Sequence, residues 1–287
     1  GPSGSVNALL VLPDGKLLIG GAFGSFNGQP CGAVVRLNPD GTLDSAFTSA
    51  VPANAGVECI ARQSDGKLLV GGSFVASGSG VGNRLGRLNA DGTGDTAFAP
   101  GAGFDGTVWT IAVQADGRIV VGGAFTNYAG VVANHIVRLN SGGSRDASFA
   151  VGTGFDSDVY SVAVFGGGRI AVGGRFGSVD GAGHYNFAVL TPGGVLDTAF
   201  ADLPSSAGAA VVATGTGEVL LGGAFTWICT PASGLARFAA SGTLTAVATG
   251  AFRSPGTINT ALPVADGKWM IGGMFSAVNG VERYSLA

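Results

Sequence analysis

Two acidic turns carry the residue pattern that most suggests chemistry, because it resembles part of a calcium-binding loop. The pattern N-x-D-G-x-x-D occupies residues 38–44 and 89–95, whereas the full loop begins with a further acidic ligand, as in D-x-N-x-D-G. That first ligand position holds Arg36 in one copy and Arg87 in the other. A guanidinium there would repel a cation and attract the carboxylate. We therefore expect Asp-Gly turns with arginine–aspartate pairs and no metal. The expected pairs are Arg36 with Asp44, Arg87 with Asp95 and Arg138 with Asp146.

The histidines and cysteines do not complete a metal site. His135 and His184 have no third imidazole and no H-E-x-x-H motif beside them, so the usual zinc ligand sets are missing. Three cysteines, an odd number without a C-x-x-C spacing, form no disulfide framework and no metal knuckle. They are Cys31, Cys59 and Cys229. We expect no metal and no cofactor.

Carboxylates that could work as a general acid and base are few. A hydrolytic site would combine Glu58 with Asp105, Asp156 or Asp158, because glycoside hydrolysis uses two carboxyl groups on either side of the scissile bond. No further motif of a nucleophile or a base accompanies them. A hydrolytic function is therefore the alternative hypothesis and not the preferred one.

The elements that would position these residues come from an internal repeat that fills the chain. Six segments align without gaps and end in Gly-Gly-x-Phe. They are Asp14 to Phe23, Asp65 to Phe74, Asp116 to Phe125, Gly167 to Phe176, Thr216 to Phe225 and Asp266 to Phe275. A second block, Arg36 to Phe47, recurs at Arg87 to Phe98 and Arg138 to Phe149, more loosely at Val189 to Phe200 and weakly at Arg237 to Val247. The sixth copy stops before this block.

Each repeat predicts four short antiparallel strands. β-branched runs end at Asp-Gly or Gly-Gly turns, which are hairpin signals, and glycine interrupts every candidate helix. About 50 residues and four strands per unit, repeated six times, predict an all-β, six-bladed β-propeller with an incomplete last blade. A parallel solenoid is the competing architecture. We expect residues 1–5 to be an expression scar or linker and residues 6–287 a single domain, with blades starting near residues 6, 57, 108, 159, 208 and 258.

The composition supports a packed domain. The 287 residues are 46% hydrophobic and only 11% charged, which is too little charge for a disordered chain. No apolar run approaches the length of a membrane span, and a net charge of -3 with scattered arginines offers no phosphate-binding patch. We expect no nucleic-acid partner and no membrane insertion.

The repeat resembles a known family. The pattern V-x-x-(L/I)-A-V-x-x-D-G-(K/R)-(I/L)-x-(V/I)-G-G-x-F, followed by R-L-N-x-D-G-(T/S)-x-D-x-x-F, is similar to the delta-60 repeat of bacterial β-propeller proteins. The resemblance covers residues 6 to 287, with departures in the fourth and fifth copies. It implies a secreted or cell-surface bacterial protein, and it implies no shared set of catalytic residues.

One position varies where its neighbours repeat. The residue seven before each turn is Asn7, Glu58, Trp109, Tyr160, Ala209 and Asn259. By analogy with other propellers it should lie at the rim of the central channel, near loops that carry Phe104 and Phe155. Aromatic rings beside polar groups suit a sugar ring or a peptide. The predicted ligand-binding residues are Glu58, Trp109, Tyr160, Asn259, Phe104 and Phe155. The competing interpretation is that these rings fill the channel and loops as core.

The preferred function is therefore non-enzymatic: a binding, adhesion or scaffold propeller with a glycan or a protein or peptide ligand at the channel mouth. The alternatives are a carbohydrate-active or other hydrolytic propeller and a structural spacer without a ligand.

Overall fold

The structure, a computed structural model, describes residues 1–75, 80–200, 207–213, 217–226, 232–239, 241, 243–249, 257–263, 269–274, 277–278 and 281–282. Within these ranges it is β-structure with one 3-10 helix, η1 (Gly166–Gly168). The all-β prediction is confirmed. The chain divides into two compact units, Gly1–Asp146 and Ala147–Ala287, whereas the sequence predicts a single domain over residues 6–287. That single domain stays a prediction.

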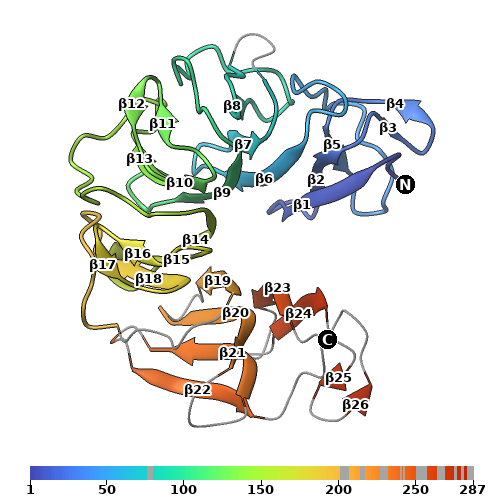
Figure 1. Cartoon of the computed structure of the whole chain (residues 1–287). Helices are drawn as coiled ribbons and strands as arrows, with labels where there is room; N and C mark the ends of the chain where they lie inside the picture. Colours follow the sequence, from blue (N-terminus) through green and yellow to red (C-terminus); the bar gives the residue numbers. More distant parts are fainter. Residues whose placement is uncertain are drawn as a thin grey trace. The chain divides into compact units, whose positions relative to one another are not determined.

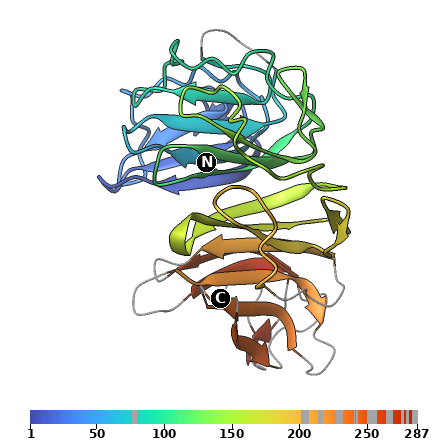
Figure 2. The same ribbon diagram turned by 90° about the vertical axis from the view of Figure 1, so that its left-hand side faces the viewer.

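The first unit holds repeats 1 (β1–β5), 2 (β6–β8) and 3 (β9–β13), coloured blue to green in Figure 1. Its strands are β1 (Ser5–Val11), β2 (Leu17–Ala22), β3 (Ser25–Phe26), β4 (Gln29–Pro30), β5 (Val34–Leu37), β6 (Val57–Arg62), β7 (Leu68–Gly72), β8 (Leu85–Leu88), β9 (Val108–Val113), β10 (Ile119–Gly123), β11 (Asn127–Tyr128), β12 (Val131–Val132) and β13 (Ile136–Leu139). They form the antiparallel sheets β1-β2-β5, β6-β7-β8 and β9-β10-β13, with the short hairpins β3-β4 and β11-β12. Figure 2 shows the strands of this unit running side by side across the view.

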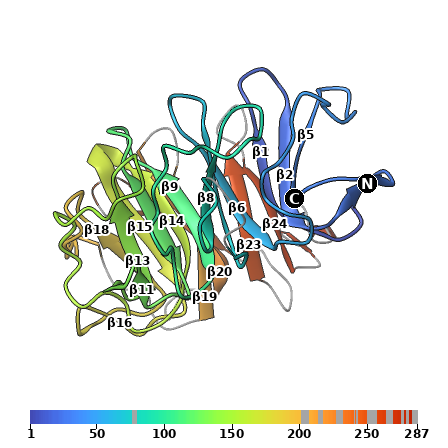
Figure 3. The same cartoon turned by 90° about the horizontal axis from the view of Figure 1, so that it is seen from above.

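The second unit holds repeats 4 (β14–β18), 5 (β19–β22) and 6 (β23–β26). Its strands are β14 (Val159–Phe165), β15 (Arg169–Gly174), β16 (Ser178–Val179), β17 (Ala182–Gly183), β18 (Phe187–Leu190), β19 (Ala207–Ala213), β20 (Val219–Thr226), β21 (Ala232–Phe238), β22 (Leu244–Thr249), β23 (Thr257–Pro263), β24 (Trp269–Met274), β25 (Ala277–Val278) and β26 (Val281–Glu282). The order β14-β15-β18 can be followed in Figure 3. Repeat 5 forms the four-stranded sheet β19-β20-β21-β22.

The fourth strand of repeats 1 to 4 differs from the prediction. Where the sequence predicts a strand, the structure has a single bridge in each repeat, such as Leu37 with Leu43 and Leu190 with Leu196. The reason lies in the aspartate that follows. Asp44 accepts the amide N–H of Ala46 on its own side chain, at 3.0 Å, and this local turn ends the extended segment after one pair.

Successive repeats of the first unit pack through the first glycine of Gly-Gly-x-Phe. A Cβ at Gly20 would lie 2.7 Å from Val57 and 2.9 Å from Ile60, both in the first strand of the next repeat. A Cβ at Gly71 would meet Val108 at 2.5 Å in the same way. These contacts are too close for any side chain, so the glycine makes room for the core layer between repeats.

Each of repeats 1 to 3 is also held by a buried aspartate shared between two cations. Asp95 accepts Arg87 Nε and Lys67 Nζ, each at 2.7 Å, and its other oxygen accepts the Ala97 amide at 3.1 Å. The three residues come from β8, from the start of β7 and from the fourth segment, so the carboxylate ties the parts of one repeat together. The same arrangement is Asp44 with Arg36 and Lys16, and Asp146 with Arg138 and Arg118. The predicted arginine–aspartate pairs are confirmed, each at 2.7 Å.

The arginine of this cluster reaches the next repeat as well. Arg36 Nη1 donates to the carbonyl of Ala90, and Arg87 Nη1 donates to the carbonyl of Ser141. Both carbonyls lie in the turn after the third strand of the following repeat, at residues 89–92 in repeat 2 and 140–143 in repeat 3. Backbone bonds reinforce the contact, since the Thr48 amide donates to Asp91 O at 2.9 Å. This turn is thus a point of contact between successive repeats, which gives its recurrence in the sequence a structural reason.

Repeats 4 and 5 keep an ion pair at this place with different partners. In repeat 4 Val189 takes the place of the third-strand arginine, and Arg169 pairs with Asp197 at 2.8 Å. In repeat 5 Glu218 stands where repeats 1 and 2 have Lys16 and Lys67, and its carboxylate accepts a hydrogen bond from Arg237 Nε at 3.0 Å. The aspartate position of that repeat holds Thr245. An ion pair is therefore present at this place in repeats 4 and 5 as well, although other residues form it.

We expect Asp95→Asn to destabilise the protein strongly. Asp95 and Arg87 are 5% and 6% exposed, and removing the anion leaves two cations without their charge partner, a change that costs about 3 to 5 kcal/mol at buried pairs. The matched control is Asp116→Asn, because Asp116 pairs with Arg118 in an exposed turn, where the loss should stay below about 1 kcal/mol. Urea denaturation monitored by tryptophan fluorescence measures both. Equal losses in the two variants would contradict the assignment.

Acid should weaken the same cluster. The Lys16 hydrogen bond, followed by the Ala46 amide and Arg36, lowers the pKa of Asp44 below its usual value. Burial raises the pKa of Asp95, but bonds from Lys67, Ala97 and Arg87 outweigh it, and the net direction is also down. A lowered native pKa gives stability that is complete above about pH 5 and is lost as the pH falls below about 4. The free energy of unfolding should fall less steeply with acid in Asp95→Asn than in the wild type. Parallel curves between pH 5 and acid would overturn this expectation.

Candidate functional site

The variable position identified in the sequence is a β-bulge in the structure. In each repeat the pairing of the first strand with the second skips one residue: for example, Val57 pairs with Gly72 and Cys59 with Gly71, so Glu58 has no partner across the ladder. The skipped residues are Asn7, Glu58, Trp109, Tyr160, Gly208 and Asn259. In repeat 5 the register places Gly208 there, one residue before the Ala209 that the sequence alignment indicates.

The second glycine of Gly-Gly-x-Phe allows this bulge. A Cβ at Gly21 would lie 2.0 Å from the carbonyl oxygen of Ser5, and one at Gly72 would lie 2.1 Å from that of Gly56. Gly123 and Gly174 meet the equivalent carbonyls at 2.2 Å. No side chain fits at these distances, so glycine is needed for the backbone of the bulged strand to approach. A bulge re-aims the extra residue and is frequent beside functional sites.

Three of the bulge residues lie in the first unit, on consecutive first strands β1, β6 and β9. Asn7 is exposed, while Glu58 and Trp109 are partly buried. Asn7 Nδ2 donates to Val57 O at 3.4 Å, and the Asn7 side chain lowers the pKa of the neighbouring Glu58 carboxyl group. An amide, a carboxylate and an indole are thus presented by equivalent backbone positions of neighbouring repeats.

The Glu58 carboxylate is held at an energetic cost. Burial raises its pKa above the ordinary value, and the Asn7 hydrogen bond offsets only part of this effect. The ionised form is therefore disfavoured in the folded protein. Glu58 lowers stability at neutral pH, and the other repeats form the same bulge without a carboxylate. Such a residue is a candidate for a functional role.

In the second unit the bulge residues are described only in part. Tyr160 is 38% exposed on β14, and its role as a binding residue stays a prediction. Asn259 lies at the bulge of β23, and its side chain lies outside the described residues.

Phe104 and Phe155 are core residues, which corrects their assignment to the binding site. Each is 2% exposed. Phe104 packs on Phe125 with ring centroids 4.3 Å apart, and Phe155 packs on Phe176 at 4.5 Å. The recurrence of Gly-Phe-Asp in both repeats was the sequence signal for a structural role.

The aspartates after these phenylalanines hold the short hairpins. Asp105 accepts the amides of Thr126 and Asn127 at 2.9 Å each, and their side chains at 2.8 Å each. Burial raises the pKa of Asp105, but these bonds outweigh it and lower the pKa overall. Asp156 makes the same contacts with the amides of Gly177 and Ser178. A carboxylate with a lowered pKa whose oxygens accept these hydrogen bonds is a weak base and a weak nucleophile. Asp105 and Asp156 therefore do not suit the hydrolytic site, in which Glu58 would be the acid and they would be the second carboxylate.

The first residues of the chain take the same place in repeat 1. Ser3 Oγ accepts the amides of Gly24 and Ser25 at 3.2 and 3.1 Å, as Asp105 does in repeat 3. Pro2 bridges to Phe26 as Phe104 bridges to Tyr128, and β1 begins at Ser5. Residues 1–5, expected as a linker, are therefore joined to repeat 1 by hydrogen bonds in this structure.

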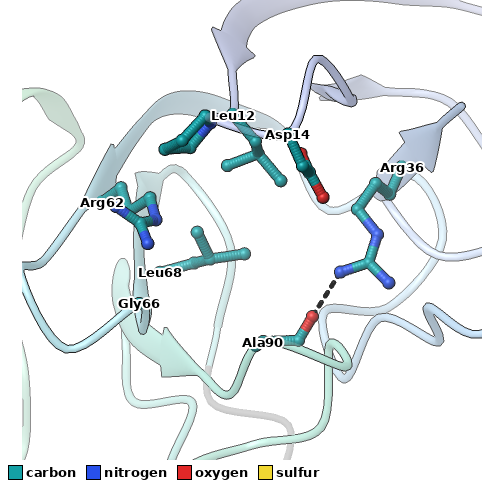
Figure 4. Close-up of a pocket in the computed structure, with 8 residues that line it drawn as sticks. Leu12, Asp14, Arg36, Arg62, Gly66, Leu68 and Ala90 are labelled. Carbon is teal, nitrogen blue, oxygen red and sulfur yellow. Dashed lines mark hydrogen bonds between the residues drawn. The ribbon is translucent and has the colours of Figure 1, made fainter. Parts of the chain in front are cut away.

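Sequence reasoning missed a pocket at the other end of β6, between repeats 1 and 2. It has a volume of about 230 Å³. Arg62 and Arg36 face it from two sides with Leu12 and Leu68 between them (Figure 4). The available signal was Arg62 itself, because the same strand position is Val11, Val113 and Val164 in repeats 1, 3 and 4. Over the parts of the chain that the structure describes, no three His, Cys, Asp or Glu residues cluster as metal ligands.

Comparisons with known proteins agree with this geometry. Residues 12–47, 63–98, 114–149 and 168–200 match the family described as "Domain of unknown function (DUF5122) beta-propeller". Each match runs from the end of a first strand to the phenylalanine of the fourth segment, or nearly so. A comparison with curated proteins gave no match.

Solved structures match over most of the chain. Virginiamycin B lyase from Staphylococcus aureus is 13% identical with a TM-score of 0.60, covering 94% of this chain and 78% of the lyase. The gluconolactonase XC5397 from Xanthomonas campestris is 18% identical with a TM-score of 0.52, covering 91% and 80%. The extracellular domain of the hybrid two-component system BT3049 from B. thetaiotaomicron is 14% identical with a TM-score of 0.64, covering 95% of this chain and 32% of that one. At these identities the likeness shows the fold alone.

The chain is therefore an all-β protein built from β-propeller repeats. Segments of its first four repeats match the DUF5122 β-propeller family. The resemblance to bacterial β-propeller repeats is supported, whereas the narrower delta-60 resemblance and the number of blades stay predictions. Within the described ranges, no helix is long and apolar enough to cross a membrane.

We expect Glu58→Gln to stabilise the protein at neutral pH. A carboxyl group whose native pKa is raised contributes full stability below its unfolded pKa of about 4.3 and less as the pH rises through the native value. The neutral amide removes that loss, so the gain should be present at pH 7 and absent below about pH 4. Thermal melts at the two pH values measure it. Asp65→Asn, in an exposed turn, is the control and should give no such gain; a gain for Glu58→Gln that persists at low pH would contradict the burial argument.

Proposed function

We propose that the chain is a non-enzymatic binding module of a secreted or cell-surface bacterial protein, and that the bulge residues form its ligand-binding surface. The observation that carries the proposal is the bulge itself. One backbone feature, enforced by glycine, presents chemically different residues in successive repeats, so ligand contacts can vary without changing the scaffold.

The chemistry of the bulge residues favours a glycan or a peptide. In the first unit Trp109 offers an aromatic face, while Glu58 and Asn7 supply an acceptor and a donor from equivalent positions of the preceding repeats. In the second unit Tyr160 offers an aromatic face at the bulge of its own repeat. Aromatic surface with a few fixed polar groups is typical of sites for sugar rings and peptide chains. Phe104 and Phe155 are excluded from this surface by their burial.

Two structural neighbours support the extracellular location. They are the extracellular domains of BT3049 and of the one-component system BT4673 from B. thetaiotaomicron, with TM-scores of 0.64 and 0.55. This chain spans 32% and 34% of those chains, which suits a module of a larger surface protein.

A hydrolytic function is the alternative, and the raised pKa of Glu58 is the observation that favours it. A buried carboxyl group of this kind can act as a general acid. A second carboxylate is needed for glycoside hydrolysis, and Asp105 and Asp156 are committed to hairpin amides. Two neighbours are enzymes, a lyase and a gluconolactonase, at identities that show the fold alone.

The test is a screen of glycans and peptides for binding, with product analysis of every ligand that binds. For a ligand found in this way, Trp109→Ala should weaken binding by at least about tenfold, because central aromatic contacts dominate binding energy. Tyr185→Ala is the matched control, since Tyr185 is an exposed aromatic, 55% accessible, outside the bulge positions. Product formation that Glu58→Gln abolishes would replace the binding proposal with the hydrolytic one. Binding that Trp109→Ala and Glu58→Gln leave unchanged would refute the assigned surface.

A further inference from the structure

The pocket between repeats 1 and 2 lies at the Asp-Gly turn end of β6, at the opposite end of the strand from Glu58. All its lining residues belong to the first unit. They are Leu12, Pro13, Asp14, Arg36, Arg62, Gly66, Leu68 and Ala90. The inference below is independent of the function proposed for the bulge residues.

Beside this pocket, repeat 1 lacks a glutamine that repeats 2 and 3 have. Gln63 and Gln114 follow β6 and β9 and are 5% and 7% exposed. Their side-chain oxygens accept hydrogen bonds from the arginine that pairs with the aspartate in the same repeat, Arg87 at 3.3 Å and Arg138 at 3.4 Å. Leu12 holds this place in repeat 1 and has no acceptor to offer. The guanidinium of Arg36 therefore faces an open space where the other two arginines face an amide.

Arg62 is the second departure from the repeat at this spot. Where Val11 and Val113 end their strands, β6 ends in an exposed arginine. Within the described ranges Arg62 has no ion-pair partner. The framework does not need a charge there, because repeats 1, 3 and 4 form the same strand with valine. Two independent departures, at positions 12 and 62, thus meet in one cavity.

The lining chemistry selects a small carboxylate with an apolar body. Guanidinium groups bind carboxylates through paired, charge-assisted hydrogen bonds. Leu12, Leu68 and Pro13 offer apolar surface between the two arginines, as Figure 4 shows for the leucines. Asp14 on the same wall leaves a net charge of one, which disfavours a dianion such as phosphate. The volume of about 230 Å³ is smaller than that of drug-sized pockets, about 300 to 1,000 Å³.

We propose that this pocket is a binding site for small aliphatic monocarboxylates, with the carboxylate between Arg62 and Arg36 and the alkyl group on Leu12 and Leu68. A ligand of seven or so heavy atoms can reach a dissociation constant of about a millimolar or somewhat below. Binding requires no rearrangement of the ion pair, because Arg36 keeps its hydrogen bond to Asp44.

Isovalerate is the probe, titrated into the whole chain labelled with ¹⁵N and followed by backbone and arginine Nε–H NMR signals. We expect shifts confined to residues around Arg36 and Arg62, saturating at about millimolar concentration. Isoamyl alcohol, which has the same alkyl group without the carboxylate, and inorganic phosphate should cause none of these shifts. Absence of shifts with isovalerate, or equal shifts with the alcohol or with phosphate, would overturn the proposal.

Two variants borrow residues from the neighbouring repeats and should therefore fold. Arg62→Val should weaken isovalerate binding by at least about tenfold, because it removes a charge-assisted bond. Leu12→Gln restores the acceptor found at Gln63 and should close the pocket and abolish binding. Arg145→Leu is the matched control: it removes one exposed arginine and installs the residue found at Leu43 and Leu196, and binding should be unchanged. Wild-type affinity in both Arg62→Val and Leu12→Gln would show that isovalerate does not bind here.

Discussion

A carboxylate taken out of water and shared between two cations is the interaction on which the repeats depend. Asp95 bonds to a strand arginine, a lysine beside the turn and a backbone amide, and the arginine continues to the next repeat. Each partner alone would be costly to bury, so the cluster forms only when second strand, third strand and fourth segment are all in register. The cluster therefore specifies register within a repeat and contact between repeats together.

The two glycines of Gly-Gly-x-Phe have different structural roles. The first glycine admits the side chains of the following repeat, and the second admits the carbonyl that produces the bulge. Because backbone approach, and not side-chain identity, creates the bulge, residues such as Glu58 and Trp109 are free to differ. The scaffold and the variable surface are thus specified by different atoms of the same short segment.

Much of this architecture follows from the sequence, because repetition exposes what every copy needs. The arginine–aspartate pairs were predictable from their constant spacing of eight residues and from the repulsion that an arginine imposes on calcium. The second cation, Lys16 or Lys67, was not, since it lies 28 residues from its aspartate and meets it only through strand pairing. Phe104 was wrongly assigned to the binding site because its burial arises from contacts with Phe125 and Tyr128, which become apparent only in the folded structure. The pocket at Arg62 could not be predicted from the sequence. The structure shows that Gln63 accepts a hydrogen bond from Arg87, and only this contact shows what Arg36 lacks where residue 12 is a leucine.

The reversed pair in repeat 5 bears on how such a chain can grow by duplication. There the second strand begins after an acid, Glu218, and the base is on the third strand, Arg237, while repeats 1 to 3 have bases in both places and the acid in the fourth segment. A copying event that joined the second strand of repeat 5 to the fourth segment of repeat 2 would bring two acids to one buried place. The reciprocal hybrid would collect bases without an acid. A duplication that preserves the ion pairs must therefore copy the second strand, the third strand and the fourth segment of a repeat together.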